Sequence, residues 1–430
     1  MMAAAEGDAL VPKLRFPEFR DAGEWGTKLL GSIGQTINGL SGKSGDDFGQ
    51  GKPFITYKQV FDSAFVDFAK CGLVEIREGE NQNEIKRGDI LFTTSSETPD
   101  EVGYASVVLR EPPCPVYLNS FCFSFRPSSP PNELIPEFSG YLFRSPIYRK
   151  LVTILAQGST RFNISKVAFL NLSLPIPQTK EQQKIADCLA SVDELITLES
   201  QKLDRLKLYK KGLMQQLFPT EGETVPRLRF PEFQGTNEWD INGLGTLTTF
   251  VNEKISIVQI SLENYISTEN ILQDYGGITK ASKLPETGSV TQFRSNDILF
   301  SNIRPYLKKV WLADKKGGAS NDVIVIRAKQ EIEAKFLSFL LKNDTFINYV
   351  MTGAKGVKMP RGDIESMKKY PTPFPLRAEQ QKIAECLTSI DDCITVQNQK
   401  IETLKTHKKG LMQQLFPVPD GFSAAQAGNT

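Results

Sequence analysis

The sequence contains few of the residues that build metal centres and common catalytic sites. It has one histidine, His407, and its six cysteines include no CxxC pair. Structural zinc needs clustered thiolates or imidazoles, so we expect no metal site. The chain also lacks the Gly-x-x-x-x-Gly-Lys-Ser/Thr phosphate loop and the Gly-x-Ser-x-Gly elbow, which argues against an ATPase and a serine hydrolase. A Ser-His-Asp or Cys-His site would have to use His407, which lies in a predicted helix.

Long apolar runs and a strong charge imbalance are missing too. No stretch is long and apolar enough to span a bilayer, and the start, "MMAAAEGDALVPKLRF", does not resemble a signal peptide. We therefore expect a cytoplasmic protein with no membrane partner. The net charge is only +1, so the overall balance gives no sign of nucleic-acid binding, although it does not exclude a local basic face.

A long internal repeat organises the chain. "EQQKIADCLASVDELITLESQKLDRLKLYKKGLMQQLFP" occupies 181–219, and "EQQKIAECLTSIDDCITVQNQKIETLKTHKKGLMQQLFP" occupies 379–417. A shorter repeat, "VPKLRFPEF" at 11–19 and "VPRLRFPEF" at 225–233, is followed in both places by Glu-Trp. The chain therefore consists of two half-molecules of about 200 residues, each a variable body followed by a conserved segment.

Each copy of the long repeat predicts a helix of about 35 residues, roughly 50 Å long. Its apolar residues recur in alternating steps of three and four, which is the a/d pattern of a coiled coil. Prolines lie before and after each segment, where they end a helix. The predicted seam consists of Leu189, Val192, Ile196, Leu203, Leu206 and Leu213 in the first copy and Leu387, Ile390, Ile394, Ile401, Leu404 and Leu411 in the second.

A single amphipathic helix of this length cannot bury its own apolar stripe. The simplest partner is the other copy, in an antiparallel pair with pseudo-twofold symmetry. The alternative is that each stripe packs on its own domain. Polar residues interrupt both seams at matching places, Glu199 with Gln397 and Lys210 with Lys408, and polar seam residues fix register or orientation.

The bodies between the repeats predict α+β domains, with strands first and helices late. "KRGDILFTT" at 86–94 and "RSNDILFSN" at 294–302 each look like a buried strand that enters a polar loop. Segments 116–127 and 322–328 predict further strands, and segments 136–152 and 333–351 predict amphipathic helices.

Candidate DNA contacts lie in polar loops of both bodies. Each late helix is followed by a basic loop with glycines, "AQGSTRFNISK" at 156–166 and "MTGAKGVKMPRGD" at 351–363. Exposed amides and cations suit a phosphate or a base edge, and a solvated connecting loop is the alternative. Adding segments 54–62, 92–99 and 301–311, the candidates are Tyr57, Lys58, Thr93, Thr94, Arg161, Asn163, Lys166, Ser301, Asn302, Arg304, Tyr306, Lys355, Lys358 and Arg361.

The layout resembles the specificity (S) subunit of type I restriction–modification systems over nearly the whole chain. The resemblance rests on the paired "EQQKIA…KKGLMQQLFP" segments, the proline-rich stretches before them, and the two "LRFPEF…EW" motifs. It implies two globular target-recognition domains joined by two long antiparallel coiled-coil helices, with a pseudo-twofold internal repeat. Each domain would read one half of a split DNA site, and the helices would act as spacer and docking surface.

The resemblance also implies partners. The chain would have no catalytic activity and no cofactor of its own. It would bind double-stranded DNA, two modification (methyltransferase) subunits and restriction (translocase/endonuclease) subunits, and those partners would carry S-adenosylmethionine, ATP and Mg. Two alternatives from other classes are a structural adaptor that does not read DNA and a self-contained nuclease, for which no acidic cluster is evident.

The expected domain organisation follows the repeats. We expect a first target-recognition domain, a first spacer helix, a second target-recognition domain, a second spacer helix and a flexible tail. Their respective ranges are 1–175, 176–219, 220–375, 376–417 and 418–430.

Overall fold

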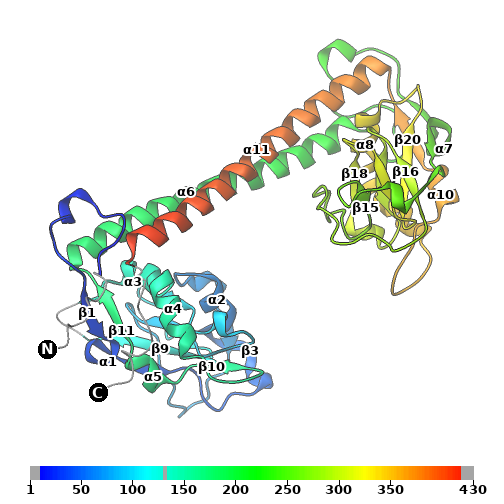
Figure 1. The fold of residues 1–430 in the computed structure, drawn as a ribbon. Coiled ribbons are helices and arrows are strands. Elements are labelled where there is room, and N and C mark those ends of the chain that lie inside the picture. Colours follow the sequence, from blue (N-terminus) through cyan, green and yellow to red (C-terminus); the bar gives the residue numbers. More distant parts are fainter. Residues whose placement is uncertain (1–9, 129–132, 418–430) are drawn as a thin grey trace. The chain divides into compact units, whose positions relative to one another are not determined.

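The computed structural model describes residues 10–128 and 133–417 and divides into two compact units. Among these residues, the first unit contains 10–128, 133–199 and 400–417, and the second contains 200–399. The units therefore do not follow the halves of the sequence: each combines one body with the start of its own long helix and the end of the other one (Figure 1). The predicted flexible ends, the first ten residues and 418–430, lie outside the described residues except for Leu10.

The first unit is built on a four-stranded sheet of order β2-β9-β5-β7 and a three-stranded sheet of order β4-β3-β8. Two further pairs, β1-β11 and β10-β6, are antiparallel. The strands are β1 (Gly26–Leu29), β2 (Gly34–Asn38), β3 (Phe48–Ile55), β4 (Gly72–Val74), β5 (Ile90–Thr93), β6 (Ser95–Ser96), β7 (Ala105–Val107), β8 (Tyr117–Leu118), β9 (Cys122–Pro127), β10 (Phe162–Asn163) and β11 (Ser173–Ile176).

Short helices cover these sheets and complete the core of the first unit. They are α1 (Leu30–Ile33), α2 (Tyr57–Asp62), α3 (Pro136–Leu142), α4 (Pro146–Ile154) and α5 (Lys166–Leu170). Segment 136–152 therefore contains two helices, because Ser145 caps the second one with its side chain. Buried aromatic rings of β5, β9, α3 and α5 pack together, as in the contact between Phe92 and Phe169 with ring centroids 4.7 Å apart.

The second unit repeats this plan. The sheet β13-β20-β17-β18 corresponds to the four-stranded sheet of the first unit, a second sheet has the order β14-β16-β19-β15, and β12 pairs with β21 as β1 does with β11. The elements are β12 (Asp240–Gly243), α7 (Leu244–Leu247), β13 (Thr248–Phe250), β14 (Lys254–Ser256), β15 (Tyr265–Ile266), β16 (Ser289–Phe293), β17 (Ile298–Ser301), β18 (Val310–Leu312), β19 (Gly317–Ala319), β20 (Val323–Ala328), α8 (Ala334–Leu341), α9 (Asp344–Thr352), α10 (Ile364–Lys368) and β21 (Pro371–Phe374). The expected mixed helix–strand class with two repeated domains is confirmed.

Both bodies contain the sequence "DILF", which leads into an inner strand of the main sheet. We call this strand, β5 in the first unit and β17 in the second, the central strand. β5 and β17 are buried along their whole length. The aspartate before each strand is buried and receives a two-pronged ion pair from an arginine on the neighbouring strand, Asp89 from Arg126 and Asp297 from Arg327. A buried carboxylate needs such a partner. The shared "DILF" sequence therefore reflects an aspartate–arginine pair that both units contain.

Two continuous helices of 39 residues each carry the long repeat, α6 (Thr179–Leu217) and α11 (Arg377–Leu415). In the first unit Asp193 of α6 accepts from Lys408 of α11 at 2.6 Å, and Glu199 pairs with Lys400. In the second unit Lys210 of α6 pairs with Asp391 of α11 at 2.6 Å. In the first unit the residue numbers on α11 fall as the numbers of their partners on α6 rise. These two helix segments are therefore antiparallel neighbours.

The predicted seam residues are all buried or half-buried. Leu189, Leu203, Leu387 and Ile401 are buried, whereas Leu208 on the outer face of α6 is 70% exposed. The a/d pattern therefore identified the side of each helix that is turned away from solvent.

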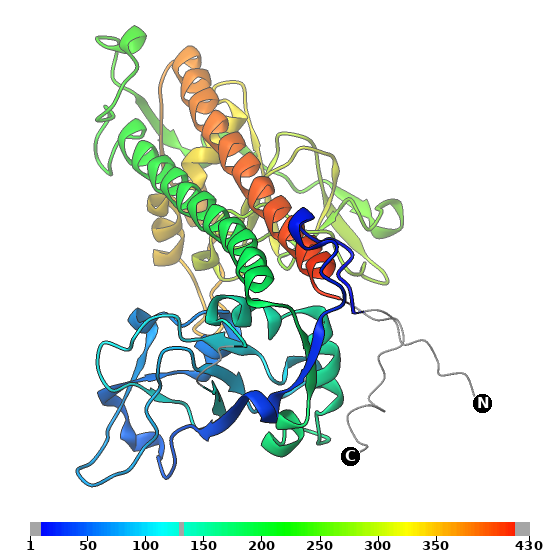
Figure 2. The ribbon, with the colours of Figure 1, turned by 90° about the vertical axis from the view of Figure 1, so that its left-hand side faces the viewer.

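The "LRFPEF" motif joins the two helices at the end of each unit. In the first unit the backbone N–H of Leu14 donates to the carbonyl of Gln414 at 2.9 Å, while Arg15 forms a two-pronged pair with Glu181 in the first turn of α6. Figure 2 shows this N-terminal segment, in blue, lying across the red end of α11. Trp25 completes the junction, since its indole N–H donates to Glu181 at 3.2 Å and its ring meets Phe416 edge-on.

The second unit has an equivalent junction, although the indole N–H of Trp239 has no hydrogen-bond partner among the described residues. Leu228 donates to the carbonyl of Gln216 at 2.9 Å, Arg229 pairs with Glu379, and Trp239 meets Phe218 edge-on. We call these two junctions the helix clamps. They explain why both the "LRFPEF…EW" motif and the "QQLFP" ending are repeated: the two motifs are parts of one contact.

Candidate nucleic-acid interface

The basic loop of the first unit is a tight hairpin. The backbones of Gln157 and Asn163 exchange two hydrogen bonds of 3.0 and 2.9 Å. Gly158 has φ +137°, and a Cβ placed on it would lie 2.0 Å from the carbonyl oxygen of Arg161. Only glycine fits at this position, so the hairpin is a defined turn.

The basic loop of the second unit is the same hairpin. Lys355 and Arg361 exchange two backbone hydrogen bonds of 2.9 Å, and Gly356 has φ +97°. Both hairpins contain seven residues, and both are followed after one residue by the capping side chain of a short helix, Ser165 for α5 and Asp363 for α10. The two loops that the sequence singled out are therefore equivalent residue by residue.

Each hairpin docks on the loop that follows the central strand. In the first unit Asn163 pairs with Ser95, and the N–H of Ile164 donates to the carbonyl of Thr94 at 3.0 Å. In the second unit Arg361 bridges Ile303, and the N–H of Arg304 donates to the carbonyl of Pro360 at 2.8 Å. The fold thus brings together, within each unit, the two candidate segments that are far apart in the sequence.

Cations and an exposed aromatic ring mark the first hairpin. Arg161 is exposed, and its guanidinium lies 5.2 Å from the ring centroid of Phe121, which is itself 53% exposed. Asn163 is exposed beside it. Lys166 contacts the amide oxygen of Asn38, and partial burial lowers the pKa of its ammonium. Sequence reasoning missed Phe121, because a phenylalanine beside a strand is more often buried.

Helix α2 supports the first hairpin from below. The hydroxyl of Tyr57 donates to the carbonyl of Ser95 at 2.6 Å, and burial raises the pKa of this phenol. Tyr57 therefore holds the loop on which the hairpin docks. Lys58 is exposed on the same helix and pairs with Asp62 at 2.7 Å.

Two candidate residues are core residues instead of surface residues. Thr93 is fully buried, and its hydroxyl oxygen accepts the backbone N–H of Tyr104 at 3.0 Å. Ser301, at the equivalent place in β17, is 1% exposed and donates to the carbonyl of Ile303 at 3.1 Å. The expectation of direct DNA contact by these two side chains is therefore corrected: the central strand continues through them before the loop begins.

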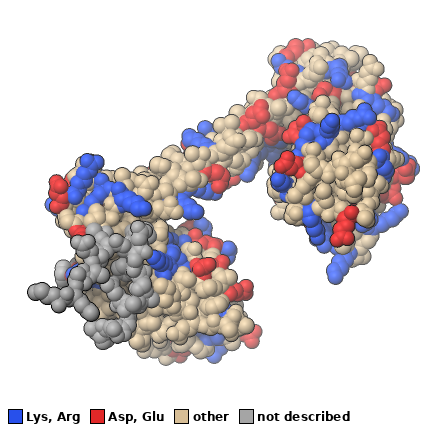
Figure 3. Space-filling model, in the orientation of Figure 1, with Lys and Arg blue, Asp and Glu red and all other residues tan. Residues whose placement is uncertain are grey.

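The second hairpin carries three cations, of which two form ion pairs. Lys355 pairs with Asp363 at 3.0 Å and Arg361 with Asp322 at 3.0 Å. Within residues 10–128 and 133–417, neither Arg304 nor Lys358 has a side-chain hydrogen bond or ion pair, and both are exposed. Basic side chains gather around the lower end of this unit in Figure 3, where the hairpin projects in Figure 1.

Two other candidate residues lie near this hairpin, Tyr306 on the surface and Asn302 beneath the hairpin. Tyr306 is 49% exposed. Asn302 is half-buried beneath the hairpin, where its amide oxygen has no hydrogen-bond partner among the described residues. Gly362 packs closely there, because an added Cβ would lie 2.2 Å from Met367.

Metal chemistry and membrane insertion find no support in the described part of the chain. No cluster of three or more His, Cys, Asp or Glu side chains could hold a metal ion there. No helix of those residues is both long and apolar enough to cross a membrane. The hairpins and their neighbours offer cations, amides and backbone groups, which suit recognition of an anionic polymer better than bond-making chemistry.

Comparison with known proteins identifies the family. The family described as Type I restriction modification DNA specificity domain matches residues 22–208 and 248–406, most of the chain, as two segments. The chain belongs to this family. Each matched segment contains one body and most of one long helix, so the family match also records the internal repeat.

Individual family members are similar to the chain over nearly all or over more than half of their length. A putative type I restriction enzyme specificity subunit, MjaX of Methanocaldococcus jannaschii, is 26% identical over 91% of this chain and 93% of its own. The EcoDI specificity subunit of Escherichia coli is 23% identical over 57% of this chain. The crystal structure of the type I S subunit from M. genitalium has the same fold, with a TM-score of 0.53 at 14% identity over 95% of this chain and 99% of its own.

Proposed function

We propose that this chain is the DNA-recognition subunit of a type I restriction–modification complex and that each body reads one half of a bipartite site. The observation that carries the proposal is the repeated hairpin: one per unit, docked in the same way after the same strand, but with different tip residues. Equivalent frames with different side chains suit two half-sites of different sequence. Family membership supplies DNA as the ligand.

The proposed contacts are the candidates whose side chains are exposed or half-buried. In the first unit they are Lys58, Thr94, Arg161, Asn163 and Lys166, with Phe121 added. In the second they are Asn302, Arg304, Tyr306, Lys355, Lys358 and Arg361. Tyr57 acts through the loop that it supports. Cations and amides of this kind can bind phosphates or the edges of guanine and adenine.

The two long helices would act as an antiparallel coiled-coil spacer. The proposed domain limits remain those of the repeats: recognition domains at 1–175 and 220–375, and helical segments at 176–219 and 376–417. The interhelical ion pairs in each unit and the burial of the seam support this arrangement.

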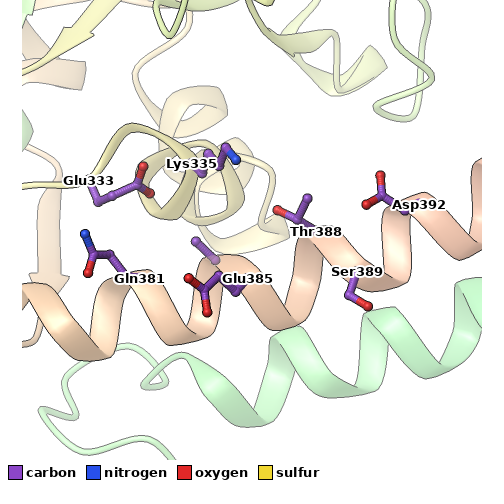
Figure 4. Close-up of a pocket in the computed structure, with 8 residues that line it drawn as sticks. Glu333, Lys335, Gln381, Glu385, Thr388, Ser389 and Asp392 are labelled. Atoms are coloured by element: carbon purple, nitrogen blue, oxygen red, sulfur yellow. The ribbon is translucent and has the colours of Figure 1, made fainter.

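We also propose a docking face for the modification subunits. A groove lies between the start of α8 and the first half of α11 (Figure 4). On α11 it is lined by the small residues Ala384, Thr388 and Ser389 and by the acidic residues Glu385 and Asp392. The same positions of α6 hold Ala186, Ala190, Ser191, Asp187 and Glu194. A small, acidic helix face that occurs twice fits two copies of one partner.

The remaining partners would supply the chemistry. Modification subunits would bring S-adenosylmethionine, and restriction subunits would bring ATP and Mg. The chain itself would bind no cofactor and catalyse no step, because its role is to choose the DNA sequence.

A methylation map tests the function. The chain is co-expressed with the modification subunit from the same source, and modified adenines are located by single-molecule sequencing. We expect one split motif with an unspecified spacer, and replacement of 26–175, which includes the first hairpin, with another family body should change one half only. A stably assembled complex that modifies no motif would favour the adaptor, and metal-dependent cutting by the purified chain alone would favour a nuclease.

Two substitutions test the assignment of one domain to one half-site. Arg161→Ala and Arg304→Ala should each weaken recognition of one half only, by about 1–3 kcal/mol, the usual value of a well-placed base contact. Both side chains are exposed, so folding should not change. Binding to duplexes altered in one half at a time measures the effect. If either folded variant lost both halves equally, the assignment would be wrong.

A further inference from the structure

The tips of the two hairpins differ in chemistry although their frames match. Because both hairpins have seven residues and the same anchors, Val357 occupies the place of Ser159, and Met359 occupies the place of Arg161. The first tip is polar and ends in a guanidinium. The second presents two apolar side chains between Lys355 and Arg361.

These apolar side chains are exposed to an unusual degree. Val357 has a relative exposure of 103%, and Met359 one of 49%. Neither belongs to the hydrophobic clusters of the second unit. A fully exposed valine on a rigid turn contributes nothing to the core, so its side chain is available to a ligand.

The surroundings indicate what that ligand is. The cations of Lys355, Lys358, Arg361 and Arg304 lie on the hairpin and on the loop beneath it, which favours a polyanion over an apolar protein surface. A two-stranded ribbon fits the major groove of B-DNA, and the apolar group exposed there is the C5-methyl of thymine. The minor groove presents no such methyl group.

We propose that the second recognition domain reads a thymine through its C5-methyl group, with Val357 as the contacting residue and Met359 beside it. This inference rests on the proposed function and adds to it a base and a residue. The half-site of the second domain then contains at least one A·T pair at the position facing the hairpin tip. Ser159 and Arg161 of the first domain give its half-site no equivalent methyl contact.

Deoxyuridine substitution tests the proposal, since it removes the methyl group and keeps the base pairing. The full-length chain, assembled with its modification subunits, is titrated with duplexes that carry the mapped motif. Each thymine of either strand in the second half-site is replaced in turn. We expect one position at which the substitution weakens binding about three- to fivefold, the factor that burial of one methyl group provides. The complex with Val357→Ser should bind the two duplexes equally.

Controls separate this inference from the proposed function. Ser159→Ala, the matched change in the first hairpin, should leave the deoxyuridine effect unchanged, and melting curves verify that each variant is folded. Specific binding without any sensitive thymine, or with a sensitivity that persists in Val357→Ser, overturns the thymine contact and leaves the proposed function intact. Absence of specific binding by an assembled wild-type complex overturns both. Loss of subunit assembly in Val357→Ser would show that the tip binds protein.

Discussion

At the scale of single residues, both units place a cation in the same half-buried position. Arg144 and Lys342 each directly precede the side chain that caps the next helix, Ser145 or Asn343. Arg144 donates to four backbone carbonyls, those of Val60, Phe61, Ser63 and Ala105, at 2.7–2.9 Å. Three of these carbonyls lie in or just after α2, so one guanidinium holds the helix that supports the first hairpin.

Replacement of this guanidinium should destabilise the first unit strongly. Arg144→Met leaves four carbonyls without their partner, and we expect the free energy of unfolding to fall by about 3 kcal/mol. Arg144→Lys should recover part of the loss, because an ammonium has three donors but no planar fork. Arg110→Met, at an exposed position of the same unit, is the control and should stay within about 0.5 kcal/mol of wild type. Urea denaturation measures all three, and a loss as small as the control's would contradict the supporting role.

The corresponding residue of the second unit, Lys342, makes the stability of that unit depend on pH in the alkaline range. Burial and the nearby charge of Lys210 lower the pKa of Lys342 to about 8, whereas an unfolded lysine titrates near ~10.4. Between these values the unfolded chain holds a proton that the folded chain has released, so the contribution of Lys342 to stability rises with pH.

Thermal melting between pH 7.5 and 10 tests this dependence. Wild type should gain stability relative to Lys342→Met as the pH rises, since the variant cannot release a proton there. Lys335→Met, at an exposed position of α8, should show no such change relative to wild type. A constant difference between wild type and Lys342→Met across the range would mean that Lys342 titrates normally.

Single residues also show where the sequence was sufficient. The loops with Arg161 and Arg361 could be found because glycines and cations identify a basic turn. The burial of Thr93 and Ser301 could not be predicted, since a hydroxyl at the end of a strand suits core and surface equally. The equivalence of the two hairpins could not be predicted from the sequence either, because they share only the glycine. Their common shape is fixed by backbone hydrogen bonds, which most sequences can form.

At the scale of elements, the polar seam residues form specific pairs. Lys408 pairs with Asp193 and lies 5.3 Å from the ring centroid of Tyr141, while Lys210 pairs with Asp391 and lies 5.2 Å from that of Phe339. In each unit a lysine of one long helix therefore contacts the other helix and the first late helix of the body. The seam pattern predicted that these lysines fix register. It could not predict their aromatic partners, because these rings belong to bodies with little sequence similarity.

Two leucines of α6 provide a matched test of the seam. Leu203 is 8% exposed and Leu208 is 70% exposed. Leu203→Asp buries an unpaired charge and should lower the free energy of unfolding by about 3 kcal/mol and impair docking of the modification subunits. Leu208→Asp should change stability by no more than about 0.5 kcal/mol. Denaturation and co-purification with the modification subunit measure both effects, and normal stability and assembly of Leu203→Asp would count against the seam.

At the scale of the whole molecule, the two helix clamps share the backbone bond and the arginine–glutamate pair but differ in chain connection. In the second unit five residues, 220–224, join the end of the first long repeat, Pro219, to the motif that begins at Val225. In the first unit no such loop joins the end of α11 to the motif that begins at Val11. The two are held by the hydrogen bond from Leu14 to Gln414, which is 2.9 Å long like the equivalent bond in the second unit.

This equivalence predicts that the chain tolerates circular permutation. A variant that begins at Val225, runs to Pro417, continues through a copy of 220–224 into Val11 and ends at Pro219 keeps every clamp contact. We expect it to assemble with the modification subunits, to melt within a few degrees of the control and to yield the same methylation motif, because both hairpins are unchanged. The control is the chain 11–417 in its natural order, which lacks the same terminal residues. If the permuted chain were unfolded while this control was normal, the bond between Leu14 and Gln414 would not be equivalent to the one between Leu228 and Gln216.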